Sequence, residues 1–175
     1  MRWLIYTITV LAGLIVLAIV GVFGIGALLP EEQTVTRSVV ITKPPEVVWQ
    51  TITDYAAAPT WRPQVRSVER LADQNGRAAW RVTDNNGDAV TMEVVDAVPP
   101  RRLVDHFTDS PDSNDVVWEF AIAPLASDTQ VTITERARIS KPYVRFLWRF
   151  VFGAKFPDDY LVALARKFGD PPVLQ

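Results

Sequence analysis

Residues 34–52, TVTRSVVITKPPEVVWQTI, hold the strand-to-helix transition that decides the fold. Alternating, β-branched side chains over residues 34–42 predict a β-strand. Pro44 and Pro45 then open a helix, because the first helical turn does not use the N–H that proline lacks. Glu46 favours the same start, since a carboxylate is stabilised at the positive end of a helix. One face of this helix carries Val48, Ile52 and Tyr55.

Turn signals divide the sequence after this helix into strands. Asn75-Gly76 and Asn86-Gly87 are favoured two-residue hairpin sequences, because both central residues of a type I′ turn need positive φ. Pro99-Pro100 ends another strand, and a polar loop over residues 109–115 separates two more. The predicted strands cover residues 67–72, 77–84, 89–97, 102–108, 116–123 and 130–139. With residues 34–42 they make about seven antiparallel strands.

A long apolar helix is expected near the end of the chain, over residues 143–156. Pro157 interrupts it in this prediction, and Asp158-Asp159 begin a new helix. The first of these helices is apolar nearly all round, which indicates burial or contact with lipid. We expect one side to pack on the sheet. The other side is expected near a membrane surface and carries Trp148, Phe152 and Phe156 beside Arg149 and Lys155.

The N-terminal stretch over residues 3–29 carries no charged side chain. As a helix it is roughly 40 Å long, which exceeds the roughly 30 Å hydrocarbon core of a bilayer. We therefore expect a transmembrane anchor over residues 1–30 and one soluble domain over residues 31–175. A cleaved signal peptide is an alternative, although its apolar part is usually only about 7 to 15 residues long and Gly24-Ile25-Gly26 is a poor cleavage site. A buried helix of a soluble protein is a third.

The side of the membrane on which the domain lies is set only weakly by charge. Arg2 precedes the apolar stretch, whereas Arg37 and Lys43 follow it closely, so the positive-inside rule gives little preference. A very short leader favours export of the domain behind it. We expect a single-pass protein of a bacterial inner membrane with the domain outside the cytoplasm. The absence of cysteine is compatible with either side.

Composition excludes several classes of function. After residue 30 there are 17 basic and 20 acidic residues, a net charge of about −3 that does not suit binding to nucleic acid. Without cysteine and with a single histidine, the chain offers neither a zinc site nor a Cys-His pair, and we expect no metal and no cofactor. The histidine, His106, is expected on the surface, although a shift of one residue in its strand would turn it inward.

The order of these elements resembles the START-like, helix-grip domain of the SRPBCC superfamily, which includes polyketide cyclase and dehydrase relatives, birch-pollen-allergen-type proteins and lipid carriers. The resemblance rests on VVI at residues 39–41, PPEVVW at 44–49, YAAAPTWRP at 55–63 and TQVTITE at 129–135, and it extends over residues 35–168. It implies an α+β fold in which a curved antiparallel sheet of about seven strands surrounds a C-terminal helix. It also implies a largely apolar cavity between sheet and helix.

Alternation along the strands indicates which side chains face that cavity. A competing interpretation is that the aromatic members simply fill a close-packed core. The candidate cavity residues, from the strands and the terminal helix, are Trp80, Val82, Met92, Val94, Trp118, Phe120, Ile133, Glu135, Phe146 and Phe150.

Glu135 is the polar member of this inward set. A carboxylate on an apolar sheet face has a raised pKa unless it is paired, which makes Glu135 a candidate acid, base or ligand anchor. The alternative is a structural salt bridge to Arg145 or Arg149. Near the mouth of the cavity, Trp61-Arg62 is a candidate gate, and Arg101-Arg102 a candidate rim that attracts an anionic group, although packing and solvation explain both equally well.

Three functions are consistent with this sequence. The first is a membrane-anchored binding protein for a hydrophobic small molecule such as a lipid, isoprenoid or aromatic metabolite. The second is an enzyme of the cyclase or dehydrase kind with Glu135 as general base. The third is a structural or partner-binding domain, which a cavity too small for any ligand would favour. We favour the first, and leave the ligand and the oligomeric state open.

Overall fold

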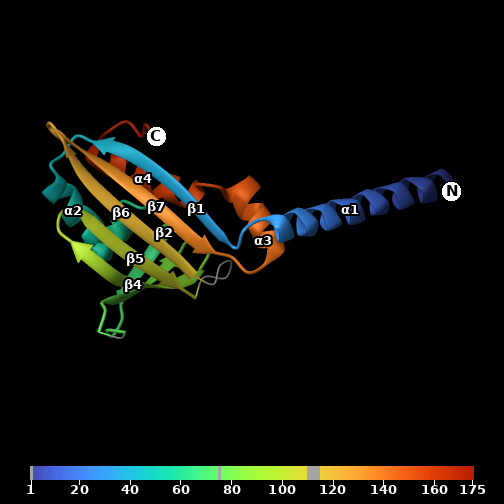
Figure 1. Cartoon of the computed structure of the whole chain (residues 1–175), viewed down its shortest axis with the longest axis horizontal. Helices are drawn as coiled ribbons and strands as arrows, with labels where there is room; N and C mark the ends of the chain where they lie inside the picture. The colour runs from blue at the N-terminus through green and yellow to red at the C-terminus, as the bar shows by residue number, and fades with distance from the viewer. Residues whose placement is uncertain (1, 75, 110–114) are drawn as a thin grey trace.

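The computed structural model describes residues 2–74, 76–109 and 115–175 (Figure 1). A helix, α1 (Arg2–Leu28), projects from an α+β domain that holds every other element. Residues Ile5–Leu28 are long and apolar enough to cross a membrane, as either an anchor or a signal sequence. Domain and helix meet where α1 contacts α3 (Pro142–Leu147).

The domain is built on one antiparallel sheet of seven strands in the order β1-β7-β6-β5-β4-β3-β2. This confirms the predicted fold class and strand number. The strands are β1 (Glu32–Ile41), β2 (Val65–Arg70), β3 (Ala79–Asp84), β4 (Ala89–Val98), β5 (Arg102–Thr108), β6 (Asp115–Leu125) and β7 (Asp128–Arg138). The first and last strands of the chain are neighbours, so β1 carries the sheet on beyond β7.

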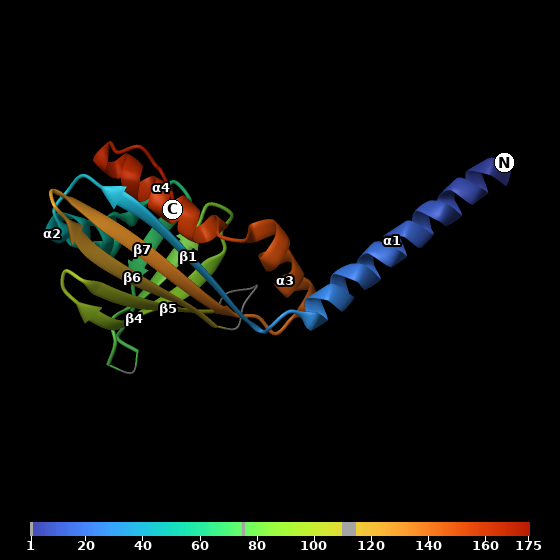
Figure 2. The same cartoon turned by 45° about the horizontal axis from the view of Figure 1, so that its top comes forward.

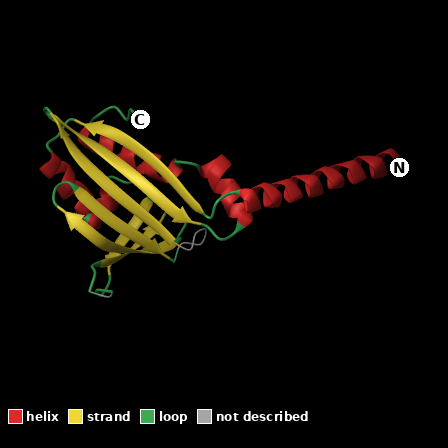
Figure 3. Ribbon diagram, in the orientation of Figure 1, coloured by secondary structure: helices red, strands yellow, loops and turns green. Residues whose placement is uncertain are grey.

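Helices cover one face of this sheet (Figure 3). They are α2 (Pro45–Thr53), which is followed by a 3₁₀ turn, η1 (Tyr55–Thr60), and α4 (Lys155–Phe168). The α4 helix contacts β1 and β7, and α2 contacts β6 and β7. Leu161 and Leu164 of α4 are fully buried against Ile41, Phe120 and Ile133 of the sheet. The main core therefore lies between the sheet and these helices.

The end of the chain differs from its prediction. The expected helix over residues 143–156 is instead α3 followed by a π-helical turn, η2 (Trp148–Phe152), and it ends at Gly153, whose φ is +51°. Pro157 does not interrupt a helix but lies buried in the first turn of α4. The first N–H groups of a helix have no partner within it, so proline is tolerated there. As a result α4 covers the main core of the sheet, and the apolar segment before it reaches only the end of β7, through Val144 and Trp148.

The hairpin between β3 and β4 is not the predicted type I′ turn. Gly87 has a φ of +93°, but Asn86 is not among the described residues with positive φ. The Gly87 N–H donates to the Asp84 carbonyl, and the Asp84 N–H donates to the Asp88 carbonyl, which closes a longer loop. At the other predicted hairpin Gly76 has a φ of +76°, whereas Asn75 lies outside the described residues. Most of the polar loop over residues 109–115 also lies outside them.

Candidate functional site

A small cavity of about 20 Å³ lies between the sheet, the α2–η1 segment and α4. A cavity needs about 10–15 Å³ to hold one water molecule, so in this conformation the space admits a water and nothing larger. Its apolar lining is Ile52, Ala58, Val68, Val82, Met92, Phe107, Trp118 and Phe120. Its polar lining is Tyr55, Trp61, Arg62, Asp105 and Tyr160.

Aromatic rings around Tyr160 occupy most of the space between α4 and the sheet. The Tyr160 ring centroid lies 5.3 Å from that of Trp61, 5.6 Å from that of Trp118 and 5.3 Å from that of Phe120. Such edge-to-face and tilted contacts are favourable for aromatic pairs. In this conformation the aromatic residues therefore fill the core, as the competing interpretation of the sequence held.

Asp105 is the buried acid of the cavity. It alternates with Leu103 and Phe107 along β5, so its side chain points inward, and only 2% of the residue is exposed. The Tyr55 hydroxyl donates a hydrogen bond of 3.0 Å to Asp105 Oδ1. Burial raises the pKa of Asp105 to about 7, against the opposing effects of this hydrogen bond and of the nearby Arg62 charge. The carboxyl group can therefore gain or lose a proton near neutral pH.

Arg62 supplies the cation of the cavity. Its guanidinium lies over the Tyr160 ring, 4.7 Å from the centroid, and burial lowers its pKa. Arg62 Nε and Trp61 Nε1 are both shielded from solvent and have no hydrogen-bond partner in the described part of the chain. Arg62 acts on Asp105 through space, without a direct ion pair between them. A polar atom in the cavity would find unused donors here.

The two tyrosines of the site stay protonated. Burial raises the pKa of Tyr55, and the Asp105 charge and hydrogen bond raise it further. Burial also raises the pKa of Tyr160. Both hydroxyl groups are therefore neutral donors at physiological pH. Asp105 is then the group of the site that changes its charge near pH 7.

Glu135 is buried but lies outside the cavity lining. It is 2% exposed on β7, paired in register with Trp118 of β6, and its Oε2 atom has no hydrogen-bond partner among the described residues. Burial raises the pKa of Glu135 to about 7, while hydrogen bonding from the Trp118 and Trp148 indoles opposes the rise. Trp118 thus has Glu135 on one side and the cavity on the other.

The alternative for Glu135, a salt bridge to Arg145 or Arg149, is not found among the described residues. Arg145 instead pairs with Glu31, with 2.7 Å between Nη2 and Oε1. Its remaining donors reach the carbonyl oxygens of Leu29, Ile139 and Ser140. The alternative partner, Arg149, is exposed. Arg145 therefore ties the connection after α1 to the end of β7, and no described basic residue forms an ion pair with Glu135.

The other predicted cavity residues separate into three groups. Val82, Met92, Trp118 and Phe120 line the cavity. Trp80 packs beside it, 5.3 Å between ring centroids from Tyr55, while Ile133 and Val94 belong to the surrounding core.

Phe146 and Phe150 do not face the cavity, which corrects the sequence-based expectation. They contact each other, with ring centroids 4.9 Å apart, and Phe150 is 59% exposed. Phe146 lies on α3 and Phe150 on η2, and the aromatic ring that reaches the cavity from the end of the chain is Tyr160 of α4.

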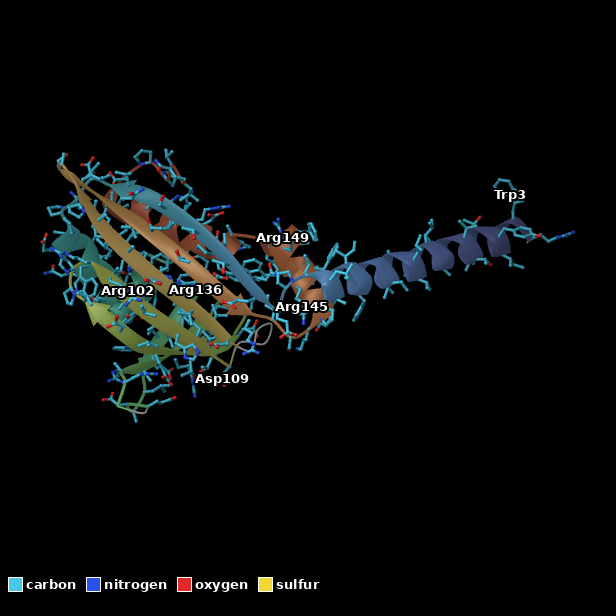
Figure 4. The ribbon with its side chains drawn as sticks, in the orientation of Figure 1. Trp3, Arg102, Asp109, Arg136, Arg145 and Arg149 are labelled. Atoms are coloured by element: carbon cyan, nitrogen blue, oxygen red, sulfur yellow. The ribbon has the colours of Figure 1, made fainter. Side chains whose placement is uncertain are left out.

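The remaining candidates lie on the other face of the sheet. His106 alternates with the inward Asp105 and pairs with Asp115. Arg102 Nε donates to Glu119 Oε1 at 2.7 Å, and Arg136 Nη2 donates to Glu119 Oε2 at 3.0 Å (Figure 4). These groups form a surface charge network and do not reach the cavity.

Sequence reasoning did not single out Asp105, Tyr55 and Tyr160 as site residues. Asp105 could have been found from its alternation with Leu103 and Phe107, and Tyr55 from the helix face that it shares with Ile52. Tyr160 carried no such signal, because residues 143–156 were expected to pack on the sheet, whereas α4 covers its main core. No group of three or more potential metal ligands occurs in the described part of the chain.

Comparison with solved structures finds the same fold. A START superfamily protein from Mycobacterium smegmatis is 18% identical with a TM-score of 0.64, over 77% of this chain and 96% of that one. The Zhui aromatase/cyclase from a Streptomyces species is 18% identical with a TM-score of 0.65, over 78% and 93%. A protein from Thermobifida fusca is 23% identical with a TM-score of 0.63, again over 78% and 93%.

A search of curated proteins finds no match. The family model described as "Polyketide cyclase / dehydrase and lipid transport", by contrast, matches residues 32–167, which include all seven strands, the helix α2 and all but the last residue of α4. With the helix-covered sheet, the enclosed cavity and the structural neighbours all in agreement, this chain belongs to the polyketide cyclase/dehydrase and lipid transport family.

Proposed function

We propose that the domain binds a small molecule with a hydrophobic body and one polar oxygen group, such as a lipid, an isoprenoid or an aromatic metabolite. The observation that carries this proposal is the pair of unused donors, Arg62 Nε and Trp61 Nε1, on residues that line a largely apolar cavity. Leaving a buried polar group unsatisfied costs roughly 1–3 kcal/mol, and native cores seldom keep such groups. A carbonyl or hydroxyl oxygen of a guest would satisfy them.

A ligand can bind only if the cavity of about 20 Å³ becomes larger, because this volume holds no more than one water molecule. Trp61 and Arg62 lie between η1 and β2, outside any paired strand, whereas Trp118 and Phe120 are held in the middle of the sheet. Connections outside the sheet open at a lower free-energy cost than core strands. We therefore assign the entrance to the Trp61–Arg62 connection, whose outward movement would also withdraw one ring from Tyr160.

The anchor fits this function. If α1 remains in a bacterial inner membrane with the domain outside the cytoplasm, the cavity stays close to the phase in which hydrophobic molecules dissolve. Tethering raises the effective concentration of the domain at that surface without any new contact.

Native mass spectrometry of the full-length protein extracted in mild detergent tests this proposal. We expect an apolar species to accompany the wild-type chain and the control variant Arg66→Met, whose arginine is exposed, and to be largely lost from Arg62→Met. Near-ultraviolet circular dichroism would establish that both variants are folded. If the wild-type protein retains no species, even after incubation with a fatty acid, an isoprenoid alcohol and a polycyclic aromatic probe, a structural or partner-binding domain with a filled core would replace this function.

A second candidate function is acid–base catalysis on such a guest. It is favoured by the Asp105 carboxyl, which lines the cavity, has a pKa of about 7 and accepts a hydrogen bond from Tyr55. Asp105, and not Glu135, is then the group placed to exchange a proton with a bound molecule. Asp105→Asn should retain the ligand in mass spectrometry but lose its conversion; retention of conversion would exclude this role.

A further inference from the structure

An exposed apolar surface follows α3. It consists of Phe150, Val151 and Phe152 of η2 and Phe156 of α4, which are 59%, 63%, 37% and 52% exposed. We refer to these four residues as the η2 patch. Three consecutive apolar side chains facing water are unusual on a soluble surface and indicate a contact that the isolated chain does not make. None of them lines the cavity.

The η2 patch directly follows α3, and α3 packs on the C-terminal end of α1 (Figure 2). The Phe23 and Tyr143 rings are 5.6 Å apart between centroids. A Cβ on Gly26 would come within 1.9 Å of the Pro142 carbonyl oxygen, so only glycine permits this approach. Arg145 also donates hydrogen bonds to the Leu29 carbonyl oxygen and to Glu31, which hold the end of α1 against α3. The apolar surface of α1 therefore continues into the domain.

Positive charge accompanies the η2 patch. Residues 136–157 contain six basic residues and no acidic residue, in a chain whose net charge is −2. Arg149 is exposed, makes no ion pair within the described part of the chain, and lies 5.9 Å from the Phe150 ring centroid. Lys155 lies 5.9 Å from the Phe156 centroid and pairs with Asp159. Figure 4 shows Arg145 and Arg149 on the side of the domain where α1 joins it.

We propose that the η2 patch inserts into the headgroup region of the bilayer that α1 spans, with Arg149 and Lys155 against anionic phosphates. The helix α1 is roughly 40 Å long and the hydrocarbon core roughly 30 Å thick, so the last turns of α1 and the side chains packed on them lie at the membrane surface. Exposed aromatic and basic side chains are favoured at that depth. The domain then has two membrane contacts, and α3 fixes the angle between them.

The absence of cysteine allows a direct test with the full-length chain. We would place a single cysteine at Val151, which is 63% exposed, or at Val173, a matched control 64% exposed in the C-terminal tail away from α1. A third cysteine at Leu14 reports on α1 itself. Each variant is labelled with an environment-sensitive fluorophore and reconstituted into vesicles of phosphatidylcholine and phosphatidylglycerol.

We expect the Val151 label to be quenched by lipids that carry a shallow nitroxide and protected from aqueous iodide, and the Val173 label to behave in the opposite way. Equal iodide quenching at both sites, with the Leu14 label deep in the bilayer, would overturn the proposal. Protection of Val151 that grows with protein-to-lipid ratio without nitroxide quenching would assign the η2 patch to a second copy of the chain. A Leu14 label outside the bilayer would also overturn it.

A second pair of variants, one at Arg149 and one at a control arginine, tests whether positive charge contributes to membrane contact. Arg149→Gln should reduce the gain in nitroxide quenching of the Val151 label when phosphatidylglycerol replaces part of the phosphatidylcholine. Arg166→Gln, an exposed arginine near the far end of α4, should leave that gain unchanged. An equal response in both variants would show that Arg149 does not meet the anionic headgroups.

Discussion

Asp105 and Glu135 are two acids with the same burial and different surroundings. Each is 2% exposed on the inner face of the sheet, and burial raises the pKa of each to about 7. Asp105 accepts a hydrogen bond from Tyr55 beside a cavity with a cation, whereas Glu135 meets two indoles and leaves one oxygen unpaired. Burial alone therefore does not mark a ligand site; the cavity and the neighbouring donors do.

The two acids are separated by a single side chain. Asp105 pairs in register with Trp118, and Trp118 pairs in register with Glu135, across three neighbouring strands. Trp118 gives one surface to the cavity and the other to Glu135. On the far side of Glu135, Trp148 belongs to η2, next to the η2 patch. This row of four side chains, from Asp105 through Trp118 and Glu135 to Trp148, thus connects the candidate ligand site to the segment that follows α3.

Removing the separating ring should have the largest effect. Trp118→Ala leaves a void between the acids and should lower the free energy of unfolding by about 3–5 kcal/mol. It should also lower the raised pKa of Asp105, because water can enter, whereas at Glu135 the loss of the Trp118 hydrogen bond opposes this effect. Chemical denaturation in mild detergent, followed by circular dichroism, measures the loss. Trp3→Ala, on α1 outside the folded domain, is the control, and a Trp118→Ala loss no greater than that of the control would show that Trp118 does not support the core between the acids.

Stability should fall as pH rises. The folded domain holds protons on Asp105 and Glu135 up to about pH 7, whereas the unfolded chain releases them near pH 4. The contribution of these two acids to the free energy of unfolding is therefore largest below about pH 4 and decreases towards pH 7, by on the order of 1 kcal/mol per pH unit for each acid. Denaturation at several pH values in the same detergent measures this slope.

The Glu135→Gln variant should lose part of this slope and be more stable than the wild-type chain at pH 8. Glu69→Gln, at an exposed position on β2, should keep the full slope. A wild-type stability that rises between pH 4 and pH 7 would contradict the raised pKa values of both acids.

Tyr55→Phe should distinguish the two acids. It removes the hydrogen bond to Asp105 and should cost about 1–2 kcal/mol at neutral pH. The pKa of Asp105 should rise further, because that hydrogen bond favours the carboxylate, while the pKa of Glu135 should not change. Carboxyl carbon NMR measures both. Tyr143→Phe, on α3, is the matched control, and equal shifts of the two acids would show that they titrate as one unit.

Gly26→Ala should have the smallest effect on stability and act on Glu135 alone. The added methyl group meets the Pro142 carbonyl, so α3 must shift and take Trp148 with it. Overpacking of about 1–3 kcal/mol is partly offset by the roughly 1 kcal/mol that alanine gains over glycine in a helix. A change in the Glu135 pKa, without one at Asp105, is expected by NMR. Gly24→Ala, where a Cβ meets nothing within 4 Å, should change neither.

Much of the fold was predictable because its signals are local. Residues 102–108 were predicted as a strand and form β5 with the same bounds, since Pro99-Pro100 and the alternation after it are both short-range. Glu135 was expected on the inner face from alternation alone, and it lies there. The helix break was misplaced because Pro157 is compatible with either a helix end or a first helical turn, and only packing selects between them.

The site was less predictable than the fold. Arg145 binds Glu31, which is 114 residues away in the chain, so no spacing rule could identify the pair. The cation of the cavity comes from the η1–β2 connection, the acid from β5 and the second tyrosine from α4. The sequence around each of these side chains carries no local signal of a binding site. Their meeting depends on strand pairing and on which helix covers the sheet.

By itself, the sequence determined the number of strands, the helix that follows the first strand and the apolar N-terminal helix, because hydrophobic period and proline position act within a few residues. The tertiary structure alone decided that α4 covers the sheet, that Asp105 rather than Glu135 lines the cavity, and that aromatic rings leave about 20 Å³ there. The physical reason is that burial and pairing depend on groups brought together from distant parts of the chain, and these set the pKa values and the free volume.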